Sequence, residues 1–182
     1  EEPPWSQQQV EVVQAIRETF TEEIASFYNI FSPISYLKRW FRTDTSRGDE
    51  EVADLLLENP EQFRVILDVI AGDIASLTQK IIQQGGVDGI YLSTQEIQDE
   101  RITPALYQTY IEPSNIAVLK AANQVGGTNI LHICGFEGAS NDVTIFKDYP
   151  AQVVNWATHH EDVSLTRGQE LFQGKAVLGG FE

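Results

Sequence analysis

The feature that most constrains the fold is a regular alternation of short apolar runs with helix-length segments. We expect strands over residues 25–31, 87–93, 128–134, 152–156 and 176–178. Between and before them, apolar residues recur at three- and four-residue steps, which predicts helices over residues 6–24, 34–41, 60–84, 103–125, 141–147 and 165–172. Strands separated by helices are typical of βαβ units, so the sequence predicts a parallel sheet in one domain spanning residues 1–182.

Local signals set some of the helix boundaries. Asn59-Pro60 and Thr103-Pro104 each place an N-cap residue before a proline at the first helical position. In the first helix, we expect the core to be contacted by Val10, Val13, Ile16, Phe20 and Ile24. The polar stretch over residues 43–51, with Asp49-Glu50-Glu51 inside it, is expected to be a solvated turn.

Two architectures fit alternating strands and helices: an open doubly wound sheet and a closed barrel. The Gly-rich turn that binds a dinucleotide phosphate is absent after every expected strand. We therefore expect an α/β fold of the (β/α)8 TIM barrel type. Because a barrel of this type needs eight strands, we expect the sequence to cover roughly strands 3 to 7 and the domain to be incomplete at both ends.

Charge limits the classes of partner. Twenty-seven Asp and Glu residues against 12 Lys and Arg give a net charge of −15, which repels nucleic-acid phosphates and anionic lipid surfaces. No apolar run approaches the ~20 residues that span a bilayer. We expect a cytoplasmic protein with no nucleic-acid or membrane partner. The single cysteine, Cys134, excludes an internal disulfide.

The most informative segment is Leu131-His132-Ile133-Cys134-Gly135, at the end of an expected strand. Side chains two residues apart on a strand share a face, so His132 and Cys134 point the same way. Imidazole and thiolate are preferred zinc ligands, and barrel active sites form at carboxyl strand ends. The alternative is a small buried cysteine beside a hydrogen-bonded core histidine. A zinc site needs a third ligand, from Glu96, Glu137 or a residue outside this sequence.

Other strand ends carry weaker candidates. We expect three segments to lie in strand-end loops that line a pocket: residues 31–33, 93–96 and 179–181. Ordinary caps and turns explain them equally well. The adjacent His159 and His160 face different ways and are expected at the surface. The sequence contains no GxSxG, P-loop or HExxH motif, which disfavours a serine hydrolase, a P-loop nucleotidase or a zincin.

The order of several segments resembles the uroporphyrinogen decarboxylase family, which includes methyltransferases. The segments that carry the resemblance are Asn29-Ile30-Phe31-Ser32-Pro33, Gly89-Ile90-Tyr91-Leu92-Ser93-Thr94-Gln95, Tyr110-Ile111-Glu112-Pro113, Asn129-Ile130-Leu131-His132-Ile133-Cys134-Gly135, Val154-Asn155-Trp156 and Leu178-Gly179-Gly180. The resemblance implies an enzyme with a barrel fold and a site at the carboxyl ends of the strands. Residues expected to contact the substrate are Phe31, Ser32, Tyr91, Ser93, Gln95 and Gly180.

Within that resemblance, His132 and Cys134 match the zinc-binding His-x-Cys of the cobalamin-dependent methyltransferases. The resemblance implies zinc as a cofactor, a further cysteine ligand from a strand beyond Glu182, and a corrinoid such as methylcobalamin as methyl donor. Zinc in this branch lowers the pKa of a thiol acceptor. A small-molecule thiol is then the substrate, and a corrinoid protein is a further expected partner.

The resemblance leaves two other functions open. One is cofactor-free decarboxylation of the tetrapyrrole uroporphyrinogen in porphyrin biosynthesis. Ser93 falls where that branch contacts its substrate, but Leu92 replaces its usual acidic residue, and the Pro33 segment lacks its Pro-Trp-Thr pattern. The other is a barrel without catalytic activity. Metal content separates the methyltransferase from both.

Overall fold

Five parallel strands form a single sheet in the computed structural model, which describes residues 4–20, 24–43, 46–135 and 140–180. The strands are β1 (Phe27–Phe31), β2 (Gly89–Thr94), β3 (Ile130–Ile133), β4 (Val153–Trp156) and β5 (Ala176–Leu178). Their order is β1-β2-β3-β4-β5, with every neighbouring pair parallel. The predicted parallel α/β sheet is confirmed. Its order does not reverse around a central crevice, as the order of a doubly wound sheet does.

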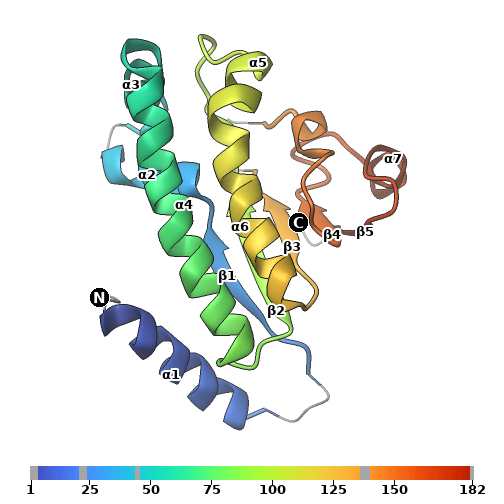
Figure 1. The fold of residues 1–182 in the computed structure, drawn as a ribbon. Coiled ribbons are helices and arrows are strands. Elements are labelled where there is room, and N and C mark those ends of the chain that lie inside the picture. The colour runs from blue at the N-terminus through green and yellow to red at the C-terminus, as the bar shows by residue number, and fades with distance from the viewer. Residues whose placement is uncertain (1–3, 21–23, 44–45, 136–139, 181–182) are drawn as a thin grey trace.

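Helices connect the strands and cover one face of the sheet. They are α1 (Pro4–Glu18), α2 (Pro33–Phe41), α3 (Asp49–Glu58), α4 (Pro60–Gln83), α5 (Pro104–Leu106), α6 (Glu112–Val125) and α7 (Leu165–Leu171), with a π-helical turn, η1 (Tyr107–Ile111), and a 3₁₀ turn, η2 (Val143–Phe146). The two longest crossover helices, α4 and α6, run side by side in front of the sheet (Figure 1).

The helix starts follow from their sequences. The Ser32 hydroxyl accepts a hydrogen bond from the Ser35 amide at the start of α2, and the Thr103 hydroxyl accepts one from the Leu106 amide at the start of α5. Asn59 precedes the first-turn proline of α4, but its side chain makes no capping bond. The predicted helix over residues 103–125 contains the π turn just before Pro113, which lacks the N–H that a regular helix uses there.

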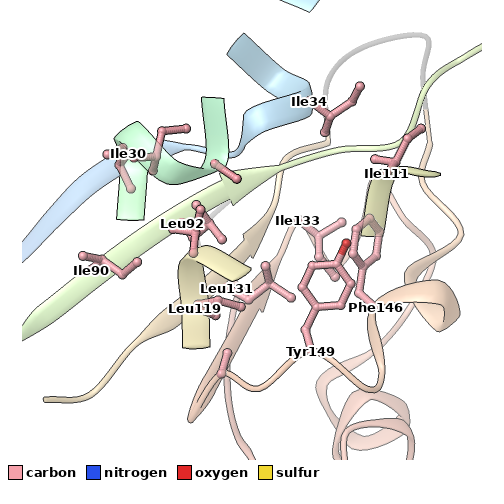
Figure 2. Close-up of a cluster of buried hydrophobic side chains, with 14 of the residues drawn as sticks. Ile30, Ile34, Ile90, Leu92, Ile111, Leu119, Leu131, Ile133, Phe146 and Tyr149 are labelled. Atoms are coloured by element: carbon pink, nitrogen blue, oxygen red, sulfur yellow. The ribbon is translucent and has the colours of Figure 1, made fainter. Parts of the chain in front are cut away.

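The core lies between the sheet and its helices. Each of the strands β1 to β4 contributes one side chain to a row of residues that are paired across the sheet: Ile30, Leu92, Leu131 and Val154. These side chains face the helices and are at most 3% exposed. Figure 2 shows these strands packing against Leu119 of α6 and against the rings of Phe146 and Tyr149. Packing of this layer fixes the positions and directions of the carboxyl ends of the strands, where the candidate site lies.

Two sequence predictions are wrong in detail. The first helix ends at Glu18, and Ile16, Phe20 and Ile24 are about half exposed, so of the five expected core contacts only Val10 and Val13 are buried. Asp49-Glu50-Glu51 is not a solvated turn but the first turn of α3. Gly48 begins that helix with a left-handed φ of 81°, and the three acidic residues interact favourably with the positive end of the helix dipole.

None of the helices in the described ranges is both long and apolar enough to cross a bilayer. The expected cytoplasmic location remains a prediction, as does the expected absence of nucleic-acid and membrane partners. The extension of the domain beyond both ends of this sequence also remains a prediction.

Candidate functional site

The face of the sheet opposite the core helices carries the side chains of the candidate site, in a row near the carboxyl ends of the strands. The register aligns one residue from each strand in this row: Phe31, Ser93, His132, Asn155 and Leu178. Alternation along each strand turns these side chains away from the aliphatic row that faces the helices. Carboxyl ends of parallel strands are where α/β folds place ligands.

His132 is held by side chains from both neighbouring strands. Its ring stacks on Tyr91 with centroids 5.0 Å apart, and its Nδ1 lies 2.6 Å from Asn155 Oδ1. The Tyr91 hydroxyl donates to the same Oδ1 at 2.5 Å. Asn155 Nδ2 in turn donates to the Leu178 carbonyl oxygen at 2.8 Å. Three strands therefore fix the plane of the imidazole.

This arrangement also determines the tautomer of His132. A carbonyl oxygen only accepts, so the Asn155 amide must turn its NH₂ toward Leu178 and its oxygen toward His132. Nδ1 of His132 is then the donor, and the neutral ring carries its lone pair on Nε2. Burial lowers the pKa of His132, which favours this neutral form, although the hydrogen bond to Asn155 opposes the shift. A neutral imidazole with one nitrogen fixed by a hydrogen bond is the form that binds metals.

Cys134 follows β3 on the same face. Its amide donates to the Thr94 carbonyl at 2.7 Å, which continues the pairing with β2, and its side chain is half-buried. Burial raises the pKa of the Cys134 thiol, the Lys38 ammonium lowers it, and the Glu161 carboxylate adds to the rise. A thiol and an unprotonated imidazole nitrogen are both suitable donors for zinc, and the alternation of side chains along β3 places Cys134 and His132 on the same face.

Asn141 ties the strand ends together. Its side chain accepts from the Glu96 amide at 2.8 Å and donates to the Cys134 carbonyl at 3.2 Å and to the Glu161 carboxylate at 2.7 Å. The Glu96 carboxylate accepts from the Asp142 amide, and burial raises the pKa of Glu96 to about 7. The loops after β2, β3 and β4 are thereby joined beside Cys134.

A cationic cavity of about 350 Å³ opens next to Cys134. It is lined by Phe31, Ser35, Lys38, Arg39, Arg42, Arg47, Gln95 and Cys134. The buried Lys38 ammonium pairs with Asp49 at 2.6 Å and donates to the Glu96 carbonyl at 3.3 Å. These four cations were not predicted from the sequence as site residues, although all of them fall within residues 38–47.

Most of the predicted site residues lie on this face, but two do not. Phe31, Gln95 and Cys134 share the cavity, and Tyr91 and Ser93 neighbour His132. Ser32 is fully buried, and its hydroxyl lies within hydrogen-bonding distance of Ser35 and Thr94, which gives it a structural role at the start of α2. Gly180 is exposed after β5 with a left-handed φ of 81°.

The third zinc ligand is not found among the described residues. No group of three His, Cys, Asp or Glu side chains within them is arranged to hold a metal ion, so Glu96 does not complete the site. Glu137 lies outside the described residues. His159 is exposed, as expected, whereas His160 is only partly so.

Residues 4–181 match the family model described as Uroporphyrinogen decarboxylase (URO-D). A search of curated proteins found none that matches.

Proposed function

The chain belongs to the uroporphyrinogen decarboxylase family, and from this premise we propose that it is part of a (β/α)8 enzyme that moves a methyl group from a corrinoid to a thiol with the help of zinc. Members of this family are enzymes. The observation that carries the proposal is the 2.6 Å contact of His132 Nδ1 with Asn155 Oδ1. Because that oxygen accepts, the proton belongs on Nδ1 and the neutral ring keeps its lone pair on Nε2; Cys134, two residues along, shares the face of His132.

His132 and Cys134 would provide two of the zinc ligands, and a residue outside this sequence would complete the set. Zinc, when bound, would supply a Lewis acid that lowers the pKa of the acceptor thiol. Overall, the thiol would release its proton to solvent and its sulfur would form a bond to the methyl carbon, while the electron pair of the broken cobalt–carbon bond would stay with the corrinoid.

The chain's own residues support this chemistry by orientation. Tyr91 and Asn155 hold the imidazole plane, so the ring does not need to be ordered when a metal binds. Asn141 holds the backbone at Cys134 against the loops that follow β2 and β4. Both proposed ligands are therefore held by hydrogen bonds to neighbouring strands and loops.

The test is zinc content and methyl transfer in the full-length protein. Protein purified with zinc supplied should hold about one zinc per chain and transfer methyl from methylcobalamin to a thiol. Cys134→Ser should lose both properties while keeping its circular dichroism spectrum. His159→Gln, which alters an exposed histidine, is the matched control and should keep both. Absence of zinc, or zinc binding that survives Cys134→Ser, contradicts the proposal.

Decarboxylation of uroporphyrinogen is the second candidate. The cationic side chains beside Cys134 favour it, because the substrate of that reaction carries carboxylate side chains. Release of CO₂ from uroporphyrinogen in the presence of a chelator, with no methyl transfer to thiols, would make this function the correct one.

A further inference from the structure

We propose that Thr94 is a positioning residue for Cys134, held in place by a buried network of hydroxyl and amide groups behind the strand ends. The inference rests on the proposed function for the role of Cys134, and it adds how the fold sets the position of that residue. A backbone hydrogen bond links the two residues, because the Cys134 amide donates to the Thr94 carbonyl at 2.7 Å. Thr94 acts through Cys134 and contacts neither metal nor substrate itself.

The Thr94 side chain lies on the opposite face of the sheet from the candidate site. Side chains alternate along β2, so Thr94 shares the helix-facing side with Leu92, whereas Ser93 faces the site. Thr94 is fully buried. This one residue therefore connects the packed interior, where its hydroxyl lies, to the backbone of Cys134, which its carbonyl holds.

Two neighbouring elements hold the Thr94 hydroxyl. The Ser32 hydroxyl donates to it at 3.0 Å from the start of α2, and Asn115 Nδ2 donates to it at 3.4 Å from α6. Asn115 Nδ2 also lies 3.3 Å from the Tyr107 hydroxyl and 3.2 Å from the Tyr149 hydroxyl, and these two hydroxyls are 3.0 Å apart. The network thereby fixes the end of β2 to α2, to α6, to η1 and to the segment before β4.

The network is costly to bury, which is the reason for assigning it a role beyond packing. Tyr107 and Tyr149 are at most 2% exposed, and Figure 2 shows Tyr149 within the apolar layer. Asn115 Oδ1 is buried and has no hydrogen-bond partner among the described residues. An unpaired polar atom in the core destabilises a fold, and apolar side chains of similar shape would fill this layer without that cost. Departures of this kind are expected where a fold serves a functional site.

The position of Cys134 is sensitive to the end of β2. Strand β3 ends at Ile133, so the bond from the Cys134 amide to Thr94 extends the pairing of β2 with β3 by one residue. A shift of Thr94 would move this bond, and with it the thiol relative to the His132 ring. Ligands of a metal site must be held within about 0.5 Å of their productive positions. Fixing Thr94 from the interior meets this requirement.

The experiment compares Thr94→Val with Thr78→Val in the full-length protein. The first substitution removes the hydroxyl and keeps the shape of the side chain. The second makes the same change at a fully buried threonine of α4 whose hydroxyl has no hydrogen-bond partner among the described residues. The measurement without metal is hydrogen exchange of the Cys134 amide by NMR. The Ile90 amide, which is buried at the opposite end of β2, is the internal reference.

In Thr94→Val, exchange at Cys134 should accelerate roughly fivefold relative to Ile90, the ratio that corresponds to one lost net hydrogen bond. Thr78→Val should leave this ratio unchanged, and Thr94→Ser, which keeps a hydroxyl, should restore the wild-type ratio. An unchanged ratio in Thr94→Val, or the same change in both valine variants, overturns the inference.

A second variant tests the far end of the network and does not alter β2. Tyr149→Phe removes one hydroxyl and keeps the ring, so it should raise the exchange ratio by a smaller factor than Thr94→Val does. Thermal melting confirms that each variant is folded. An unchanged ratio in folded Tyr149→Phe means that the network does not position Cys134, which also overturns the inference.

Zinc affinity connects this inference to the proposed function and separates the two. Thr94→Val should weaken zinc binding roughly 3- to 10-fold, less than the loss of a group that contacts a metal ligand directly, and Thr94→Ser should bind zinc as the wild type does. If the wild type binds no zinc but exchange at Cys134 accelerates as expected, the methyltransferase is rejected and the positioning of Cys134 stands. If zinc binds equally to the wild type and to Thr94→Val, Thr94 is not a positioning residue.

Discussion

Two neighbouring rows of the same sheet have opposite chemistry. Ile30, Leu92, Leu131 and Val154 form one row, which faces the helices and is almost entirely buried. The second row lies one residue further along each strand, toward the carboxyl ends, and its side chains point to the other face of the sheet. It consists of Phe31, Ser93, His132 and Asn155. The first row is aliphatic throughout. In the second row, His132 is hydrogen-bonded to Asn155 of the next strand, and Ser93 donates to Asn29 of β1.

The difference shows how the fold separates stability from chemistry. The aliphatic row needs only shape and burial, so each residue contributes through transfer from water and packing. The polar row needs specific partners: the amide of Asn155 satisfies His132, Tyr91 and the Leu178 carbonyl at the same time. Mutations in the two rows should therefore have different signatures, one in unfolding free energy and the other in metal binding.

The largest expected effect on stability comes from the aliphatic row. Leu131→Ala should lower the free energy of unfolding by about 3 to 5 kcal/mol, because a fully buried leucine leaves a cavity between the sheet and α6 (Figure 2). His132→Gln, one residue along the strand, should cost less than about 1.5 kcal/mol, since its half-buried side chain loses about one net hydrogen bond. Urea denaturation measures both, and similar losses in the two variants would contradict the division between rows.

Positioning by Asn155 should produce the next largest effect. Asn155→Ala removes the acceptor that fixes the His132 tautomer and should weaken zinc binding by roughly 10- to 100-fold, the range typical of groups that orient metal ligands. Tyr91→Phe removes only the second hydrogen bond to Asn155 and should have a smaller effect. Zinc competition with a chromogenic chelator measures both. If Asn155→Ala leaves zinc affinity unchanged while the protein remains folded, Asn155 does not position His132.

The aliphatic row was predictable from the sequence, because runs such as Ile130-Leu131 and Val153-Val154 carry a local signal. The boundaries were less predictable, with several expected strands beginning two residues too early. The first helix was expected to continue to residue 24, because apolar spacing alone does not show whether a helix face has a packing partner. Ile16 fits the spacing but is about half exposed.

The polar row was only partly predictable. His132 and Cys134 share one strand, so their common face follows from a period of two. The contact of His132 with Asn155 joins two strands and requires the register, which no single segment reveals. Likewise, Asp49 carries no local sign that it will be buried, because its partner Lys38 lies on the preceding helix. Polar partnerships depend on tertiary structure, whereas apolar patterns are visible along the chain.

The smallest expected effect concerns pH. We expect the polar side of the strand ends, unlike the aliphatic row, to lower the free energy of unfolding as the pH rises. Burial raises the pKa of Glu96 from 4.5 to about 7 in the folded protein. Between these two values the folded state binds more protons at Glu96 than the unfolded state does. Stability therefore falls as pH rises from about 4.5 through 7.

Glu96→Gln should remove this part of the pH dependence, because the glutamine oxygen can still accept from the Asp142 amide without carrying a charge. The gain at pH 8 relative to pH 5 should be about 1 kcal/mol, since partial exposure screens the effect. Urea denaturation at both pH values, with Glu100→Gln at a nearby exposed position as control, measures the difference. If the free energy of unfolding falls equally in Glu96→Gln and the wild type between pH 5 and pH 8, the Glu96 carboxylate does not destabilise the folded protein at high pH. The polar and aliphatic sides of the strand ends then do not differ in pH dependence.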